Sequence, residues 1–226
     1  MVWPRRPLCL PRGRRLSWSG RRRPRSCPAA QIPAVSATAA GFAPPGWRVE
    51  KRVVGHLDGD GRKDLAVVLI QSSSSGGAYG APDGSRALVL ARAQATGGFR
   101  RAGLAPLLLG CRECGGAFWG ASGMPVTVTI AGRAVVVQQE FGSRQLTRTT
   151  HRIRWSAPLA TFRLVGLDSL VTDRLKGTSV AVSTNHLTRR QTTIRRRGTA
   201  VLATSTRRVA VSPRAIAGLV FGRTRP

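Results

Sequence analysis

Acidic residues and lysine are both scarce in this sequence of 226 residues. Nine Asp and Glu residues stand against 37 Lys and Arg residues, which gives a formal net charge of +28. Lysine occurs only at Lys51, Lys63 and Lys176, so arginine supplies nearly all of the positive charge. Every acidic residue lies between Glu50 and Asp173, and the flanking segments are purely basic. Such segments attract polyanions or anionic surfaces nonspecifically, although arginine enrichment also accompanies a GC-rich genome.

Aromatic residues and long apolar runs are also scarce. Aromatics make up 5% of the chain, so a core must be built from Val, Leu, Ala and Ile within an apolar share of 42%. No run reaches the roughly 18 apolar residues that a membrane-spanning helix needs. The sequence therefore predicts one domain with poorly structured ends and no transmembrane segment.

Residues 1–45 differ in composition from the remainder. The stretch "PRRPLCLPRGRRLSWSGRRRPRSCP" is rich in Pro and Arg and has no apolar periodicity, which predicts disorder. The following "AAQIPAVSATAAGFA" is similar to the small-residue end of an export signal, but the apolar segment of such a signal is missing. We interpret residues 1–45 as a disordered basic segment or a degenerate export signal.

Residues 46–200 contain short Val- and Leu-rich segments separated by glycine, as strands are. The segment "PVTVTIAGRAVVVQQEFG" predicts a hairpin with its turn at "AGR". The spacing predicts a mainly β domain: an antiparallel meander or sandwich, or a partial propeller-like sheet. Residues 201–226 are interpreted as a C-terminal basic extension.

A third of the carboxylates lie in the loop of "GHLDGDGRKDLAVVLI", residues 55–70. Numbered from His56, the loop has Asp58 at position 3, Asp60 at position 5 and Asp64 at position 9. Glycine at position 6 permits a tight turn, and position 7, Arg62, offers a backbone carbonyl. Carboxylates at alternate positions can converge on Ca²⁺, which takes six to eight oxygen ligands.

This loop resembles the D-x-[DN]-x-D-G-x-x-D signature of FG-GAP and VCBS-type repeats, of which the chain has one degenerate copy. The resemblance covers roughly residues 48–70, and the wider sequence is similar to an uncharacterised bacterial type that carries one such loop. It implies a calcium site at Asp58, Asp60, Asp64 and the Arg62 carbonyl, in a secreted or periplasmic protein. His56 stands where the family has its first aspartate, and imidazole is a poor ligand for a cation that prefers oxygen. A weak or vestigial calcium loop and a metal-free Asx-type turn both remain open.

The four cysteines form two groups. Cys9 and Cys27 lie in the basic N-terminal segment, and Cys111 and Cys114 form "CREC". Too few further ligands are present to complete a zinc site, and the thioredoxin-like context of a redox motif is missing. We expect a Cys111–Cys114 disulfide, while free thiols and a metal or redox role remain open.

Two arginine-rich stretches are the best candidates for a polyanion surface. They are "TRRQTTIRRRG", residues 188–198, and "STRRVAV", residues 205–211. The candidate contacts are Arg189, Arg190, Arg195, Arg196 and Arg197. No aromatic residues interleave with them, as stacking platforms for single strands require. Arginines on the solvent-facing sides of late strands are the simpler interpretation.

No catalytic motif is recognisable, and we predict no catalytic residue and no enzyme activity. The sequence favours a noncatalytic, exported β-rich protein with a binding or structural role, such as an envelope component, and a calcium loop as its only cofactor site. The alternative is an arginine-rich protein that binds nucleic acid or another polyanion.

Overall fold

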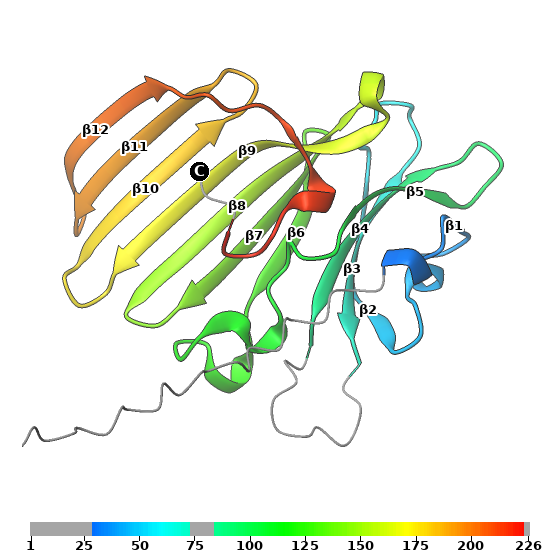
Figure 1. The fold of residues 1–226 in the computed structure, drawn as a ribbon, viewed down its shortest axis with the longest axis horizontal. Coiled ribbons are helices and arrows are strands. Elements are labelled where there is room, and N and C mark those ends of the chain that lie inside the picture. The colour runs from blue at the N-terminus through cyan, green and yellow to red at the C-terminus, as the bar shows by residue number, and fades with distance from the viewer. Residues whose placement is uncertain (1–28, 73–83, 224–226) are drawn as a thin grey trace, which may run out of the picture.

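A computed structural model of the chain describes residues 29–72 and 84–223 (Figure 1). Within these residues the chain forms thirteen strands and six short 3₁₀ turns, and no α-helix. The strands are β1 (Val35–Ser36), β2 (Trp47–Gly55), β3 (Asp64–Gln71), β4 (Arg86–Ala93), β5 (Phe99–Ala105), β6 (Val126–Ala131), β7 (Ala134–Gly142), β8 (Gln145–Ser156), β9 (Thr161–Asp173), β10 (Thr178–Asn185), β11 (Arg190–Arg197), β12 (Ala200–Arg208) and β13 (Arg214–Ala215). The 3₁₀ turns are η1 (Ala29–Gln31), η2 (Ala40–Phe42), η3 (Arg112–Gly115), η4 (Gly120–Ser122), η5 (Ala157–Leu159) and η6 (Ile216–Gly218). The predictions for residues 1–28, including Cys9 and Cys27, lie outside the described residues.

The strands form two antiparallel sheets, which confirms the predicted mainly β, antiparallel fold. The small sheet has the order β1-β5-β4-β3-β2, and the large sheet has the order β12-β11-β10-β9-β8-β7-β6, with β13 added beside β9. Figure 1 shows the large sheet running outward to β12, away from the small sheet. Because nearly every strand pairs with its neighbour in sequence, the fold is a meander closed by short turns. The predicted β6–β7 hairpin turns at Gly132 and Arg133, which both have positive φ, as a type I′ turn requires.

The main core lies between the two sheets. Ala66 of β3 and Leu88 of β4 contribute to it from the small sheet, and Val137 and Phe162 from the large sheet. All four side chains are completely buried. Successive residues of a strand point to opposite faces, so the intervening residues of β3 and β4 point away from this core.

Those intervening residues form a second core with the segment that precedes β2. Leu65 and Val67 pack there with Ile32 and Phe42, and Phe42 is completely buried. The central strands β3 and β4 are therefore covered on both faces, which explains why "LAVVLI" is a continuous apolar run rather than an alternating one. Within the segment interpreted as disordered, residues 29–45 thus include side chains of a packed core.

Residues 201–226, interpreted from the sequence as a basic extension, also contribute to the fold as far as they are described. Residues Val201 to Arg208 belong to β12, which pairs with β11. Further on, Ile216 and Leu219 are buried in the main core. The boundary expected at residue 200 falls beside a hairpin turn instead, because the basic composition masked the strand pattern of "AVLATST".

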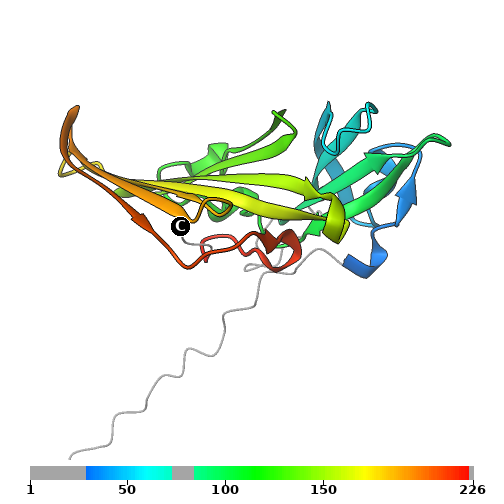
Figure 2. The ribbon, with the colours of Figure 1, turned by 90° about the horizontal axis from the view of Figure 1, so that it is seen from above.

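The segment 209–223 runs along one face of the large sheet, as the red chain in Figure 2 shows. It is fixed by the β13–β9 pairing of Arg214 with Leu164. Near its end, the Phe221 N–H donates a 2.7 Å hydrogen bond to the Leu107 carbonyl. The Phe221 ring also contacts that of Phe141, with ring centroids 4.7 Å apart.

Two histidines are buried near this segment. His151 of β8 is 4% exposed and His186 is 3% exposed, and their Nδ1 atoms have no hydrogen-bond partner among the described residues. Burial, together with the nearby Arg214 guanidinium, lowers the pKa of His151 to about 4, while a hydrogen bond to the Val137 backbone acts in the opposite direction. Burial and Arg214 also lower the pKa of His186.

We predict that the free energy of unfolding falls as the pH is lowered from about 6.5 to about 4. The unfolded chain binds a proton at His151 near pH 6.5 and the folded chain only near pH 4, so acid favours unfolding within that window. The loss from His151 is about 3 kcal/mol, since each pH unit between the two pKa values is worth about 1.4 kcal/mol. Urea unfolding of the wild type and of His151→Gln at several pH values measures it. The variant should lose the part of this dependence that comes from His151, and an unchanged dependence would contradict the assignment.

Candidate functional sites

The acidic loop connects β2 to β3, and its carboxylates bind groups of the protein itself. The Asp58 carboxylate accepts the Asp60 N–H at 3.0 Å, and the Asp60 carboxylate accepts the Arg62 N–H at 2.9 Å. These are Asx turns, and their central residues, Gly59 and Gly61, have positive φ values of 88° and 84°. Gly61 therefore has the role that the sequence predicted for it.

Asp64 closes the base of the loop from the start of β3. Its side chain is completely buried, and its two oxygens accept the backbone N–H groups of Leu57 at 2.8 Å and Ala93 at 2.9 Å. Burial raises the pKa of Asp64, while the two hydrogen bonds act in the opposite direction. Asp64 thus ties the loop to the neighbouring strand β4.

Arginine side chains occupy the outer carboxylate oxygens. Arg92 of β4 forms an ion pair with Asp58, and its Nη2 lies 3.8 Å from Asp60. Arg62 forms an ion pair with Asp60. Burial raises the pKa of Asp58, but the Asp60 N–H and the Arg92 guanidinium together hold it below its ordinary value. The Arg92 guanidinium also lies over the Trp155 ring, 4.6 Å from its centroid, and so connects the loop to the large sheet.

In this arrangement the predicted ligands do not fit a calcium ion. The Arg62 carbonyl accepts a 3.0 Å hydrogen bond from His56 Nδ1, so the proton resides on that nitrogen. The three carboxylates are directed to arginine and to backbone N–H groups. No group of three or more His, Cys, Asp or Glu residues in the described ranges is placed to hold a metal ion. Guanidinium groups supply the positive charge that the acidic loop needs.

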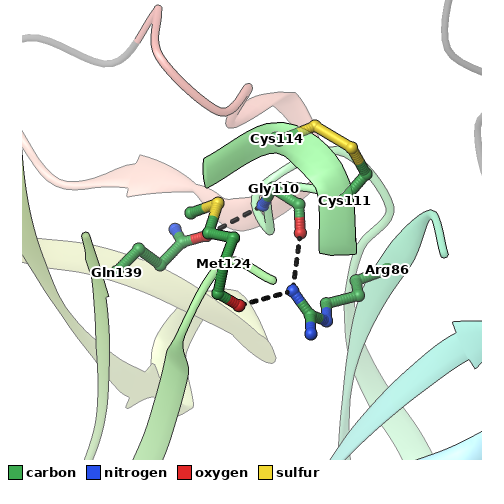
Figure 3. The surroundings of a disulfide bond; sticks show 6 residues. All are labelled: Arg86, Gly110, Cys111, Cys114, Met124 and Gln139. Carbon is green, nitrogen blue, oxygen red and sulfur yellow. Dashed lines mark hydrogen bonds between the residues drawn. A yellow bond between two sulfur atoms is a disulfide. The ribbon is translucent and has the colours of Figure 1, made fainter. Parts of the chain in front are cut away.

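Cys111 and Cys114 form a disulfide around η3, and Cys111 is 7% exposed (Figure 3). Next to the disulfide, the Gly110 N–H donates to Gln139 Oε1 at 2.8 Å, and Gln139 is almost completely buried. Gln139 donates in turn to the Leu108 carbonyl at 3.1 Å. The disulfide therefore closes a loop whose backbone is already held by a buried side chain.

A buried arginine holds the same loop from the small sheet. Arg86 of β4 is 7% exposed and donates to the carbonyls of Gly110 at 3.3 Å and Met124 at 3.1 Å. Figure 3 shows both bonds converging on one guanidinium nitrogen. The other side of the guanidinium forms two 2.7 Å hydrogen bonds with Glu50 of β2. This bidentate geometry is the strong form of an arginine–carboxylate pair, and the arrangement is that of a structural clamp.

The five predicted polyanion contacts do not form one patch. Arg189 and Arg190 lie at the start of β11, whereas Arg195, Arg196 and Arg197 lie at its end, roughly 20 Å away at about 3.3 Å per residue. The three arginines at the end of β11 are also divided between the two faces of the sheet. Side chains alternate along a strand, so Arg195 and Arg197 share one face and Arg196 lies on the other.

The structure instead joins the start of β11 to the end of β12. An open concavity of about 860 Å³ is lined by Leu187, Thr188, Arg189, Arg190, Thr206, Arg207 and Arg208. We call its four arginines, residues 189, 190, 207 and 208, the arginine cluster. No carboxylate lines this concavity. Arg190 and Arg208 are directly opposite each other in the β11–β12 ladder, a placement in which like charges are destabilising.

Buried polar contacts hold parts of the arginine cluster in place. Gln191 is 5% exposed and accepts hydrogen bonds from Nε and Nη2 of Arg207 at 3.0 and 2.8 Å. Gln191 is oriented by its own 3.0 Å bond to the Thr184 hydroxyl. Arg189 has a left-handed backbone with φ of 56°, and its carbonyl accepts the Val209 N–H at 2.9 Å. The sequence placed Arg207 and Arg208 in a candidate stretch, but only the β11–β12 register reveals that they meet Arg189 and Arg190.

We predict that millimolar calcium leaves the melting temperature of the wild-type protein unchanged relative to a chelator. The reason is that arginine and backbone N–H groups already bind the loop carboxylates. Thermal melts with both additives, together with calorimetric titration, measure the response. Arg92→Met removes the guanidinium shared by Asp58 and Asp60 and should bind calcium more tightly than the wild type. A calcium-dependent rise in the wild-type melting temperature would show that the loop is a working site.

The acidic loop and the disulfide loop have their polar groups bound within the protein, and neither indicates a ligand. The arginine cluster, in contrast, has positive charge that no carboxylate in its concavity neutralises. No helix in the described part of the chain is long and apolar enough to cross a membrane. Comparison of the chain with protein-family models, curated proteins and solved structures found no match.

Proposed function

We propose that this chain is a noncatalytic β-rich binding protein whose ligand is an anionic polymer, and that the arginine cluster is the binding site. The observation that carries the proposal is the direct opposition of Arg190 and Arg208 in a concavity without carboxylates. Two like charges held opposite each other are stabilised when an anion binds between them. Phosphate and sulfate groups suit the planar, multiply donating guanidinium.

The distribution of ion pairs supports the same site. Arginines pair with six carboxylates in the described chain, and the last of these in sequence is Asp173, which pairs with Arg144. No acidic residue follows Asp173 in the sequence. The arginines of β11 and β12 therefore keep their charge available, with Arg207 held in place by an uncharged partner, Gln191.

The acidic loop and the disulfide fit an exported protein in this proposal. The loop is a vestigial FG-GAP/VCBS-like calcium loop that retains its turn and uses Arg62 and Arg92 as its cations. The Cys111–Cys114 disulfide favours an oxidising compartment such as the periplasm or the extracellular space. A secreted or envelope-associated protein would meet anionic polymers there, including nucleic acid released from cells and acidic surface polymers.

We predict that neutralising the arginine cluster reduces affinity for polyanions more than neutralising four other positive residues. The test variant is R189Q/R190Q/R207Q/R208Q. The control is R48Q/R52Q/K63Q/R100Q, which removes the same charge from exposed residues of the small sheet and the acidic loop. Binding of the full chain to a random DNA duplex, to inorganic polyphosphate and to heparin is measured at two salt concentrations. For the duplex, the slope of log affinity against log salt should become shallower by roughly 3 to 4 in the test variant, because each neutralised phosphate accounts for about 0.9.

The duplex and polyphosphate carry phosphate groups and heparin carries sulfate groups, so comparing the three affinities tests whether the site prefers one anionic group. A preference for polyphosphate or the duplex over heparin would indicate phosphate recognition, and the reverse would indicate sulfate. Equal loss of affinity in the test and control variants would contradict a localised site, since binding would then follow net charge alone.

A further inference from the structure

The free edge of β12 is exposed at the outer end of the large sheet. β12 is the last strand of the large sheet and pairs only with β11 among the described strands. All nine of its residues are exposed, including Val201 at 57% and Leu202 at 59%. Figure 1 shows it at the outer end of the sheet, far from the small sheet. Its outward backbone N–H and C=O groups are therefore open to another strand.

The other long edges in the described part of the molecule are covered or short. β6, at the opposite end of the large sheet, contacts β2 and β3 of the small sheet. On its far side the small sheet ends in β1, which has two residues. Natural proteins usually protect an open edge with charges, proline or a bulge. Residues 200–206 contain no charged residue and no proline, and the one irregularity of the β11–β12 ladder lies between Val201 and Ala203 and leaves Ala203 to Arg208 in regular pairing. The edge of β12 is thus suited to pairing.

Arginines of the neighbouring strand surround this edge. Arg195 lies opposite Ala203, Arg197 opposite Ala200 and Arg196 opposite Val201. The small alanine side chains leave room for the guanidinium groups to extend over β12. An added strand would lie about 10 Å from β11, two strand spacings away, which an arginine and a glutamate side chain can span together.

We propose that the β12 edge binds an extended acidic segment of a partner protein by strand addition. Backbone hydrogen bonds along β12 provide the pairing, as in other cases of strand addition. Carboxylates at alternate positions of the added strand pair with Arg195 and Arg197 on one face. A second copy of this chain is a poorer partner, because its net charge of +28 opposes association. Arg195 and Arg197 lie at the opposite end of β11 from Arg189 and Arg190, and residues 200–205 of the edge do not line the concavity of the arginine cluster.

The test uses a fluorescent six-residue peptide, which matches residues 200–205 of β12 and stops short of Arg207 and Arg208, and in which glutamate alternates with valine or threonine. Binding to the full chain is measured by anisotropy, and backbone protection of β12 by hydrogen exchange. We expect protection to rise at residues 200–205. Methylation of the peptide nitrogens along one edge, or replacement of its glutamates by glutamine, should each weaken binding by at least about tenfold, equivalent to about 1.4 kcal/mol.

Two charge variants of the protein locate the peptide. R195Q/R196Q/R197Q should weaken binding by about tenfold or more, whereas R189Q/R207Q/R208Q, with the same charge removed at the other end of the hairpin, should change it by less than about threefold. Loss of DNA binding in the second variant with retained peptide binding would separate the two surfaces.

Three results would overturn the proposal. Equal binding of the peptide methylated along either edge would show that charge alone attracts it. Equal losses of affinity in the two protein variants would deny a localised site. Protection of β12 without peptide, accompanied by dimer formation in sedimentation, would identify a second copy of the chain as the occupant of the edge.

Discussion

Arginine–carboxylate pairs connect the parts of this molecule that the hydrophobic cores alone do not hold. Arg86 joins Glu50 of the small sheet to the loop that carries the disulfide. Arg92 joins Asp58 of the acidic loop and lies over Trp155 of the large sheet. These pairs use a large part of the nine carboxylates in the chain. Their placement before residue 174 leaves the last strands with arginines and no carboxylate, and that imbalance makes the far end of the large sheet strongly basic.

The acidic loop shows how arginine side chains can balance the charge of clustered carboxylates. In a calcium loop, convergent oxygens are held together by a cation that neutralises them. Here Asp58 and Asp60 are neutralised by guanidinium groups instead, and Asp64 binds two backbone N–H groups. An arginine within the chain stabilises the loop at any calcium concentration. The same contacts tie the loop to β4 through Arg92 and Ala93.

Local sequence patterns predicted more of the fold than of the candidate sites. Alternating β-branched residues indicated the β6–β7 hairpin, and "AGR" placed its turn. The apolar run of β3 indicated a strand, but not that it is buried on both faces or that Phe42, in a segment interpreted as disordered, packs on one of them. Basic composition likewise concealed β12. Composition describes the average of a segment, whereas burial depends on a few of its side chains.

The sites depend on contacts between distant residues, which no local pattern contains. Asp58 and its partner Arg92 are 34 residues apart, and Glu50 and Arg86 are 36 apart. The opposition of Arg190 and Arg208 requires the observed β11–β12 register, including its irregularity between Arg195 and Arg196. A shift of one residue would move Arg208 to the other face. The sequence could therefore identify the acidic loop and the arginine stretches, but not which of their charges remain unpaired.

The most direct measurement follows the arginine side chains themselves in the intact chain. Nitrogen-15 NMR resolves the Nε–H signals of individual arginines during titration with inorganic tripolyphosphate. We expect the signals of Arg189, Arg190, Arg207 and Arg208 to shift together at the lowest ligand concentrations. Shifts of Arg48, Arg52 and Arg100 of the small sheet at the same concentrations would contradict a localised site, because the protein would then bind anions through its total charge and not through the arginine cluster.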